Sequence, residues 1–207
     1  MDVDEIIKKF DGLIDEDVAS DVINKKLPKI DELKEGDSVG LYAKVLSVGK
    51  LKKLEKGHVK NVIIGDETGC CVLAIWGENA EMEIKEGDTI KILNGFVKQG
   101  FYGKEINVRE RGEIRKSKKN IEAKECSQFI TIDGTVEEKR DTRIHFINGK
   151  ERFFKDVRIG KKWIVLIDEK IIEMKNVEVG MHVKIKWAYE KNGKIYVDDL
   201  GKITINN

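Results

Sequence analysis

A four-residue acidic turn, Asp66-Glu67-Thr68-Gly69, is the feature that most restricts how this chain can fold. An aspartate can bond the backbone two residues further on, and Gly69 can supply the positive φ that such turns need. The residues on both sides of the turn alternate in the manner of strands. We therefore expect a hairpin whose two strands run over residues 60–64 and 70–76.

The second strand of this hairpin has two unequal faces. Leu73 and Ile75 are large aliphatic residues that suit a core. Val72 and Ala74 lie on the opposite face and are small, so that Trp76 is the one large side chain there. A large ring beside small neighbours at a strand end suits stacking on a flat ligand. A ring in this place can also close the mouth of a barrel as part of its core, and both roles stay open for Trp76.

These residues together resemble the oligonucleotide-binding (OB) folds of replication protein A, especially its archaeal forms. The match is carried by the run Val62-x-Ile64-x-Asp66-x-Thr68-Gly69, then a strand, Trp76 and Lys85-Glu86-Gly87-Asp88, and it extends over residues 34 to 116. The resemblance implies a barrel that binds single-stranded DNA, with Trp76 at the end of its third strand stacking on a base. The two unequal strand faces independently permit that role.

The order of the expected elements fits an OB fold, which is a five-stranded barrel that binds ligands on its second and third strands and the flanking loops. A short, weakly helical stretch at residues 79–84 lies between the third and fourth strands, where an OB fold inserts a helix. The other expected strands cover residues 38–48, 89–98 and 105–108.

Residues 129–207 read as a degenerate second copy of the same fold. Residues 163–169 correspond to residues 72–78, but the acidic turn is shortened to Gly160-Lys161-Lys162. Ile167 stands where the first copy has its tryptophan, while Trp163 lies four residues earlier on the same strand face. The sequence thus predicts an all-β chain of two tandem OB-fold barrels, the second with a weaker or different binding face.

A short helical segment precedes the barrels. Residues 1–27 show helical spacing, and we expect two short helices that end at Pro28, the only proline. The acidic balance of this segment argues against contact with DNA and favours packing on a neighbouring fold or another subunit. The expected divisions of the chain are an acidic helical segment at 1–30, a first OB fold at 31–116, a linker at 117–128 and a second OB-like fold at 129–207.

The net charge of +1 hides an uneven distribution. Residues 1–37 hold 12 acidic residues against 6 lysines, and the remainder of the chain is therefore net positive. Three stretches are rich in basic residues, namely 38–64, 98–119 and 139–162. Lysine-rich turns often serve only to keep strands soluble. Clusters that recur at the same places in two domains favour nucleic acid as the partner.

The candidate contacts to nucleic acid are aromatic rings that can stack on bases and basic side chains that can reach phosphates. The family also stacks a second aromatic residue on the fifth strand, and that position falls near Glu105 here. Phe101 and Tyr102, on the tip of the preceding hairpin, can take its place. The full candidate set is Trp76, Phe101, Tyr102, Tyr42, Lys44, Lys52, Lys53, Lys60, Lys98, Lys104, Arg109, Arg111 and Trp163.

The sequence contains no recognisable catalytic constellation. The three histidines are scattered without the spacing of metal ligands, and the adjacent pairs Asp66-Glu67 and Asp198-Asp199 diverge, so that neither makes an acid–base pair. There is no glycine-rich phosphate loop and no nucleophile motif. We therefore expect no enzyme activity, no cofactor and no metal.

The cysteines and the apolar runs bear on where the protein works. Cys70, Cys71 and Cys126 are odd in number and include an adjacent pair, which indicates neither a disulfide framework nor a CxxC metal site. No apolar run approaches the roughly 18 residues of a membrane span, and no N-terminal signal pattern is present. We expect a cytoplasmic protein that has no contact with membranes.

The function predicted from these features is binding of single-stranded DNA with little sequence preference, in replication, repair or recombination. One alternative is an OB-fold scaffold or subunit-interaction protein of a replication complex, which the acidic segment and the degenerate second copy favour. Another alternative is RNA binding, because an OB fold by itself does not decide the ligand. The expected partners are single-stranded DNA and other replication protein A subunits or replication and repair proteins.

Overall fold

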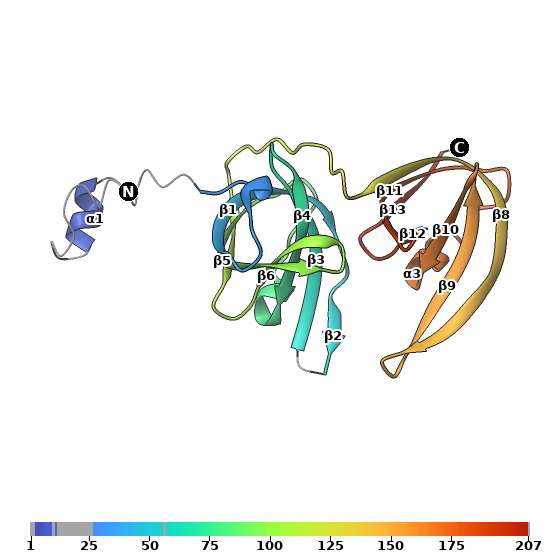
Figure 1. The fold of residues 1–207 in the computed structure, drawn as a ribbon, viewed down its shortest axis with the longest axis horizontal. Helices are drawn as coiled ribbons and strands as arrows, with labels where there is room; N and C mark the ends of the chain where they lie inside the picture. Colours follow the sequence, from blue (N-terminus) through green and yellow to red (C-terminus); the bar gives the residue numbers. More distant parts are fainter. Residues whose placement is uncertain (1–2, 10, 12–26, 56, 207) are drawn as a thin grey trace.

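A computed structural model describes residues 3–9, 11, 27–55 and 57–206. It shows two barrels joined by a linker that passes along one side of the molecule (Figure 1). In the acidic N-terminal segment it contains the helix α1 (Val3–Lys9). The second helix expected in that segment lies outside the described residues.

The first barrel is a seven-stranded sheet with the order β1-β3-β4-β6-β5-β7, in which β2 pairs with β3 and β1 closes on β5. The pairing of β4 with β6 is parallel, and the other pairings are antiparallel. Its elements are η1 (Ile30–Glu32), β1 (Ser38–Val48), β2 (Lys52–Leu54), β3 (Gly57–Gly65), β4 (Cys70–Trp76), η2 (Gly77–Glu81), β5 (Thr89–Gly100), β6 (Gly103–Val108) and β7 (Glu113–Ser117).

The second barrel repeats this arrangement with the order β12-β10-β9-β8-β11-β13, closed by β11 on β12. Asn192 and Gly193 both have positive φ and close the last hairpin, as their sequence predicts. Its elements are β8 (Ile130–Ile147), β9 (Lys150–Ile159), β10 (Lys162–Ile167), α3 (Glu169–Glu173), β11 (His182–Lys191), β12 (Lys194–Val197) and β13 (Lys202–Asn206).

The prediction of an all-β chain with two OB-type barrels is confirmed. The expected helix between the third and fourth OB strands is the 3₁₀ helix η2, and α3 takes the same place in the second barrel. The strands β2 and β7 were not predicted from the sequence. Both are short strands paired at the edge of the main sheet, where few residues show an apolar pattern.

Alternation along β4 sets which side chains form the core. Cys71, Leu73 and Ile75 are fully buried in the core of the first barrel. Val72 and Ala74 point to the other side of the strand and are also buried. Their burial shows that another part of the molecule covers the outside of the sheet.

The acidic turn is held by Asp66, as predicted. Its carboxylate accepts hydrogen bonds from the backbone N–H groups of Thr68 at 2.8 Å and Ile30 at 2.9 Å, so it fastens η1 to the hairpin. The side chain is fully buried, and the acceptor sites of a buried carboxylate must be filled by such donors. Gly69 does not adopt the expected positive φ, because the bonds to Asp66 shape the turn without it.

The expectation that the cysteines form no disulfide is wrong. Cys70 at the start of β4 is joined to Cys126 in the linker, while Cys71 is buried in the core. An odd number of cysteines and their spacing carry no information about where a linker returns to the sheet. Here the linker runs back over the acidic turn, with the Lys124 N–H donating to the Asp66 carbonyl at 2.9 Å.

The two barrels meet at an apolar junction. Ile63 and Val72 of the first barrel pack with Phe129, Tyr189 and Leu200, and all five side chains are buried. Polar contacts surround this apolar centre, including the bond from the Ser47 hydroxyl to the Leu200 carbonyl at 2.7 Å and the Lys52–Asp199 ion pair at 2.6 Å. Gly49 lies so close to the second barrel that a Cβ there would meet Asp199 Oδ2 at 2.5 Å.

Candidate nucleic-acid interface

The outer face of the first barrel is the side of β3, β4 and β6 that points away from its core. Residues that pair directly across neighbouring strands share one face of a sheet. Three rows therefore cross this face: Ile63, Val72 and Glu105; Asn61, Ala74 and Asn107; and Val59 with Trp76.

The first of these rows is closed to a ligand. Ile63 and Val72 have no exposed surface because the second barrel packs on them. The apolar junction therefore covers this row of the surface that an OB fold usually presents to its ligand. Trp76 lies at the other end of the face and is only partly buried.

Hydrogen bonds hold the Trp76 ring in position at this open end. Its Nε1–H donates to Asn107 Oδ1 at 2.9 Å, and the Asn107 amide donates to Glu105 Oε1 at 2.9 Å. Glu105 in turn forms an ion pair with Lys98 at 3.3 Å. Such a chain of bonds fixes the ring, which is only partly buried, in one orientation. Arg109 is exposed and places its guanidinium 5.8 Å from the ring centroid.

Some of the predicted basic contacts are engaged elsewhere in the protein. Lys60 alternates with the outer-face residues of β3, and its ammonium donates to the Met82 carbonyl at 2.9 Å. Desolvation by burial lowers the pKa of this lysine. Lys104 donates to the Ile30 carbonyl at 3.1 Å and so helps to hold η1.

The remaining predicted basic residues and Tyr42 lie in three places. Tyr42 and Lys44 are on β1, and the Tyr42 ring is covered by the ammonium groups of Lys91 at 5.5 Å and Lys119 at 4.5 Å. Arg111 is exposed in the turn before β7, two residues from Arg109. The third place is β2, with Lys52 and Lys53.

The hairpin tip divides its two aromatic residues between solvent and the junction. Phe101 is 54% exposed, and the Lys191 ammonium lies 3.3 Å from its ring centroid. The Tyr102 ring packs against Tyr189 at 5.0 Å, and its hydroxyl donates to the Asp198 carboxylate. The structure therefore leaves Phe101 accessible to a ligand and places Tyr102 in the contact between the barrels.

The Tyr102–Asp198 pair is buried, and this changes its acid–base behaviour. Desolvation raises the pKa of the Tyr102 phenol, with the neighbouring Asp198 charge as a further cause. Burial also raises the pKa of the Asp198 carboxyl, followed by the effect of the adjacent Asp199. Both groups are thereby favoured in their protonated forms, which suits a contact that excludes water.

Trp163 lies on the outer face of the second barrel, directly opposite Arg158 in the neighbouring strand. The Arg140 guanidinium lies 3.9 Å from the centroid of its ring, and that of Arg158 lies 5.9 Å away. Both arginines also lie within 4 Å of Glu138. The ring is thus partly buried under basic groups of its own barrel.

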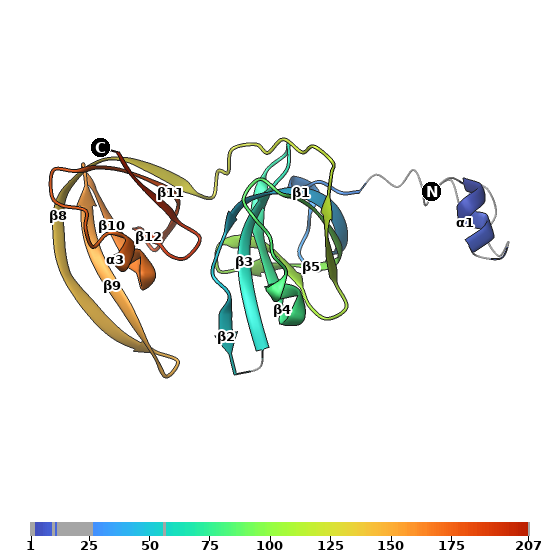
Figure 2. The same cartoon turned by 180° about the vertical axis from the view of Figure 1, so that it is seen from behind.

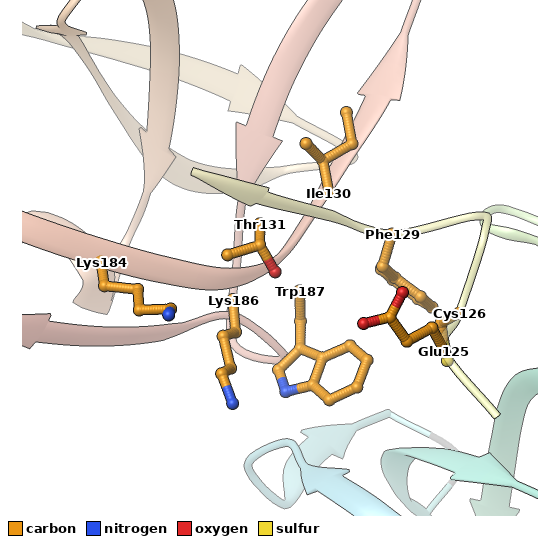
Figure 3. Close-up of a pocket in the computed structure, with 8 residues that line it drawn as sticks. All are labelled: Glu125, Cys126, Phe129, Ile130, Thr131, Lys184, Lys186 and Trp187. Atoms are coloured by element: carbon orange, nitrogen blue, oxygen red, sulfur yellow. The ribbon is translucent and has the colours of Figure 1, made fainter. Parts of the chain in front are cut away.

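A further cavity that the sequence did not indicate lies between the linker and β11 (Figure 3). Its volume is about 550 Å³. Figure 3 shows Lys184 and Lys186 on one side of the Trp187 indole and Glu125 on the other. Trp187 has a φ of 64° at a bulge in the pairing of β8 with β11. A positive φ raises the conformational free energy of a bulky residue. The bulge turns the Trp187 ring towards Phe129, and the two ring centroids are 5.9 Å apart.

Metal-binding clusters and membrane spans were also sought in the described part of the chain. No group of three or more His, Cys, Asp or Glu side chains there could hold a metal ion. Among the described helices, none has both the length and the apolar character needed to cross a membrane.

Comparison with known proteins identifies the kind of chain that carries this face. The chain is 27% identical over 214 residues to replication factor A of Methanothermobacter thermautotrophicus. The chain is replication protein A-like. The match covers 90% of this chain but only 26% of that relative, so the chain spans about a quarter of the relative's length. No family model matches the chain.

A solved structure shows the same fold. A replication protein A heterotrimer bound to single-stranded DNA matches with a TM-score of 0.53 and 12% identity, over 87% of this chain and 52% of that one. The second OB-fold domain of replication protein A from Methanococcus maripaludis is 32% identical over 46% of this chain and 98% of its own length, with a TM-score of 0.39.

Proposed function

We propose that this chain binds single-stranded DNA with little sequence preference and acts in DNA replication, repair or recombination. The observation that carries the proposal is the Trp76 ring, held by Asn107 at the open end of the outer face with Arg109 beside it. A fixed ring provides a surface on which any base can stack, because every base has a π-face. The likeness to archaeal replication factor A supports DNA as the ligand.

The proposed division of work is between rings and cations. Trp76 and Phe101 stack on bases, and exposed basic side chains such as Arg109, Arg111 and Lys53 contact phosphates. The chain is on this view a binding protein rather than an enzyme, working in the cytoplasm with other replication protein A subunits or with replication and repair proteins. Tandem barrels lengthen the strand that one molecule can hold.

A scaffold role is the second candidate, and one observation favours it. The second barrel covers Ile63 and Val72 and so removes this row from the usual ligand surface of the first. An OB fold whose face is used for packing on a neighbouring barrel serves as a structural subunit. The two candidates differ in what Trp76 does, because only DNA or RNA binding requires its ring.

The first prediction tests this point with Trp76→Ala in the full chain. We expect the affinity for oligo-dT to fall by about 1–3 kcal/mol, which is the usual contribution of one stacked base. Binding is measured by tryptophan fluorescence and anisotropy, and far-UV circular dichroism should match the wild type. Trp76→Phe is the matched variant, since it keeps a ring and loses only the bond to Asn107.

Parallel titrations separate the candidates. Tighter binding of oligo-dT than of oligo-U or duplex supports single-stranded DNA as the ligand, and the log–log salt slope should be about −0.7 for each phosphate contacted. Preference for oligo-U would instead make the protein an RNA binder. Absence of binding to all three, with intact circular dichroism, would leave the scaffold role.

A further inference from the structure

A groove runs between the two barrels, and of its lining residues the proposed function uses only Lys53 and Phe101, both from the first barrel. Two cavities of about 420 Å³ each lie there, within the range of about 300–1,000 Å³ that is typical of ligand sites. They have four lining residues in common, so they form one continuous depression, called here the inter-barrel groove. The shared residues are Lys52, Arg152, Ile167 and Asp198.

Two projecting arms flank this groove. One is β2, with the adjoining part of β3, and the other is the end of the β8–β9 hairpin. Both extend away from the linker on the same side of the molecule in two opposite views (Figures 1 and 2). The apolar junction lies between the barrels and is continuous with the groove through Tyr102 and Tyr189. The groove is therefore lined on either side by an arm, one from each barrel.

The acidic residues in the groove are matched by internal partners. Asp168 is paired with Arg152 at 2.6 Å, Asp199 with Lys52 at 2.6 Å, and Glu169 with Lys50 at 3.5 Å. The fourth acid, Asp198, accepts the hydroxyl hydrogen of Tyr102. Cations of the protein thus balance three of the four acids, and the fourth is hydrogen-bonded to a neutral phenol.

The basic residues at the rim have no such acidic partner within the described chain. Lys53 comes from the first arm and Lys150 from the second, and both are exposed lining residues. Lys191 also lines the groove, where its ammonium lies over the Phe101 ring instead of a carboxylate. The groove is thus left with an excess of positive charge on both walls, which suits an anionic ligand.

The walls also carry aromatic rings, in the part of the groove that Lys191 lines. Phe101 is exposed at the edge of the groove and packs edge-on against Tyr189 at 5.5 Å. Phe154, on the second barrel, packs edge-on against His145 at 5.4 Å. Rings beside unpartnered lysines on opposite walls suit a ligand with flat apolar groups on a chain of negative charges, and that is the chemistry of a single nucleic-acid strand.

The sheet register connects this groove to Trp76. Trp76 pairs with Val59, and Val59 pairs with Lys52 on β2, so the three lie in one row across neighbouring strands. Two strand spacings separate the ends of this row by about 10 Å. A strand stacked on Trp76 that follows this row therefore reaches Lys52, which lines both parts of the groove.

We propose that the inter-barrel groove holds the continuation of the nucleic-acid strand, with a base against Phe101 and phosphates on Lys53 and Lys150. This inference rests on the proposed function. It assigns Lys150, Lys191 and Phe154 of the second barrel to the binding path. The nucleic-acid strand then passes between the barrels instead of along the outer-face row that Ile63 and Val72 occupy.

The test compares two double variants of the full chain with equal charge change. Lys53→Glu with Lys150→Glu alters the groove, whereas Lys34→Glu with Lys118→Glu alters exposed lysines that line neither cavity. We expect the groove variant to bind oligo-dT at least tenfold more weakly than the control variant. Its log–log salt slope should be shallower than that of the control by about 1.4, corresponding to two lost phosphate contacts.

A matched pair of rings gives an independent readout. Phe101 and Phe96 are 54% and 51% exposed on the same barrel, but only Phe101 lines the groove. Phe101→Ala should weaken binding about 5- to 150-fold, as expected for one stacked base, and Phe96→Ala should not. Circular dichroism of each variant shows whether the fold is kept.

The outcomes separate the groove from the proposed function. If the groove variants bind like their controls while Trp76→Ala weakens binding, the groove proposal is overturned; the proposed function then stands on Trp76 and loses Phe101 and Lys53 from its contacts. If the wild-type chain does not bind oligo-dT, both are overturned. Loss of binding in the groove variants, beyond that of their controls, supports the path between the barrels.

Discussion

The two barrels share one strand order but use their outer faces in opposite ways. On β4 of the first barrel the outer-face residue Val72 is fully buried by the second barrel. At the corresponding place on β10 the second barrel carries Trp163, whose ring is contacted by two arginines of its own barrel and is only partly buried. The comparison teaches that OB topology does not decide whether a face is open; the neighbouring barrel does.

Side-chain size and chemistry explain the difference. Val72 and Ala74 are small, so the second barrel can approach the first closely, and the apolar contact then extends to Ile63 and Leu200. A tryptophan among arginines presents a ring and positive charge instead, which does not suit packing on an apolar surface. The outer face of the first barrel therefore combines a packing surface with the Trp76 ring, whereas that of the second presents a ring among arginines.

The largest expected effect is a loss of stability when a buried side chain at the junction is shortened. Ile63→Ala should lower the free energy of unfolding by about 2–5 kcal/mol, because it leaves a cavity at a fully buried site. Denaturant unfolding measures this change. Ile205→Ala, at a site that is 43% exposed, should change stability by less than about 0.5 kcal/mol. Equal effects of the two substitutions would mean that the face is not tightly covered and is open to ligand.

A smaller effect, on DNA binding, is expected at the outer face of the second barrel. Trp163→Ala should weaken oligo-dT binding by about 0.5–1 kcal/mol at most, less than Trp76→Ala. A base that stacks on Trp163 must first displace Arg140, and a cation–π contact at an exposed site contributes about 0.5–1 kcal/mol. The two variants are titrated side by side at one salt concentration. A loss as large as that of Trp76→Ala would make the second barrel an equal stacking site.

The smallest expected effect concerns pH at the junction. The pKa of Asp198 is raised above its ordinary value of 3.8, so its stability contribution is present at low pH and is lost as pH rises through the raised pKa. Asp198→Asn keeps an oxygen that can accept from Tyr102 and removes this loss. We expect the variant to have the higher melting temperature at neutral pH, with the difference narrowing in acid.

Melting curves over a pH series check this sign, with the exposed Asp141→Asn as the control. A wild type that becomes more stable than the Asp198→Asn variant as pH rises would show that the ionised carboxylate is favoured in the junction. Lys52, which is ion-paired with the neighbouring Asp199, would then be the side chain responsible.

Local chemistry explains why much of the fold could be predicted. The strand from Cys70 to Trp76 follows from alternation, and the acidic turn from the bonds that Asp66 can make to nearby donors. The same alternation already placed Lys60 with Val62 and Ile64 on the core side of β3, so its assignment to the nucleic-acid contacts overlooked a signal that the sequence contained.

Contacts between distant residues explain what could not be predicted. Tyr102 meets Asp198, which is 96 residues away in the sequence, and no local pattern marks either residue as part of a junction. The burial of Ile63 and Val72 on the outer face likewise depends on contacts with Leu200 and Tyr189, which are distant in the sequence. The position of Trp76 on the outer face was therefore predictable, whereas the closure of the neighbouring row and the groove beyond it were not.

The Cys70–Cys126 bond also sets the length of the covalent connection between the two barrels. With the bond in place, the connection from the first barrel to the start of β8 at Ile130 begins at Cys126, four residues earlier, and spans at most about 14 Å. With the bond reduced and the linker released, it begins at Ser117 and can span about 45 Å. Oxidation thus keeps a separated pair of barrels at high effective concentration, and reduction lengthens the connection between them.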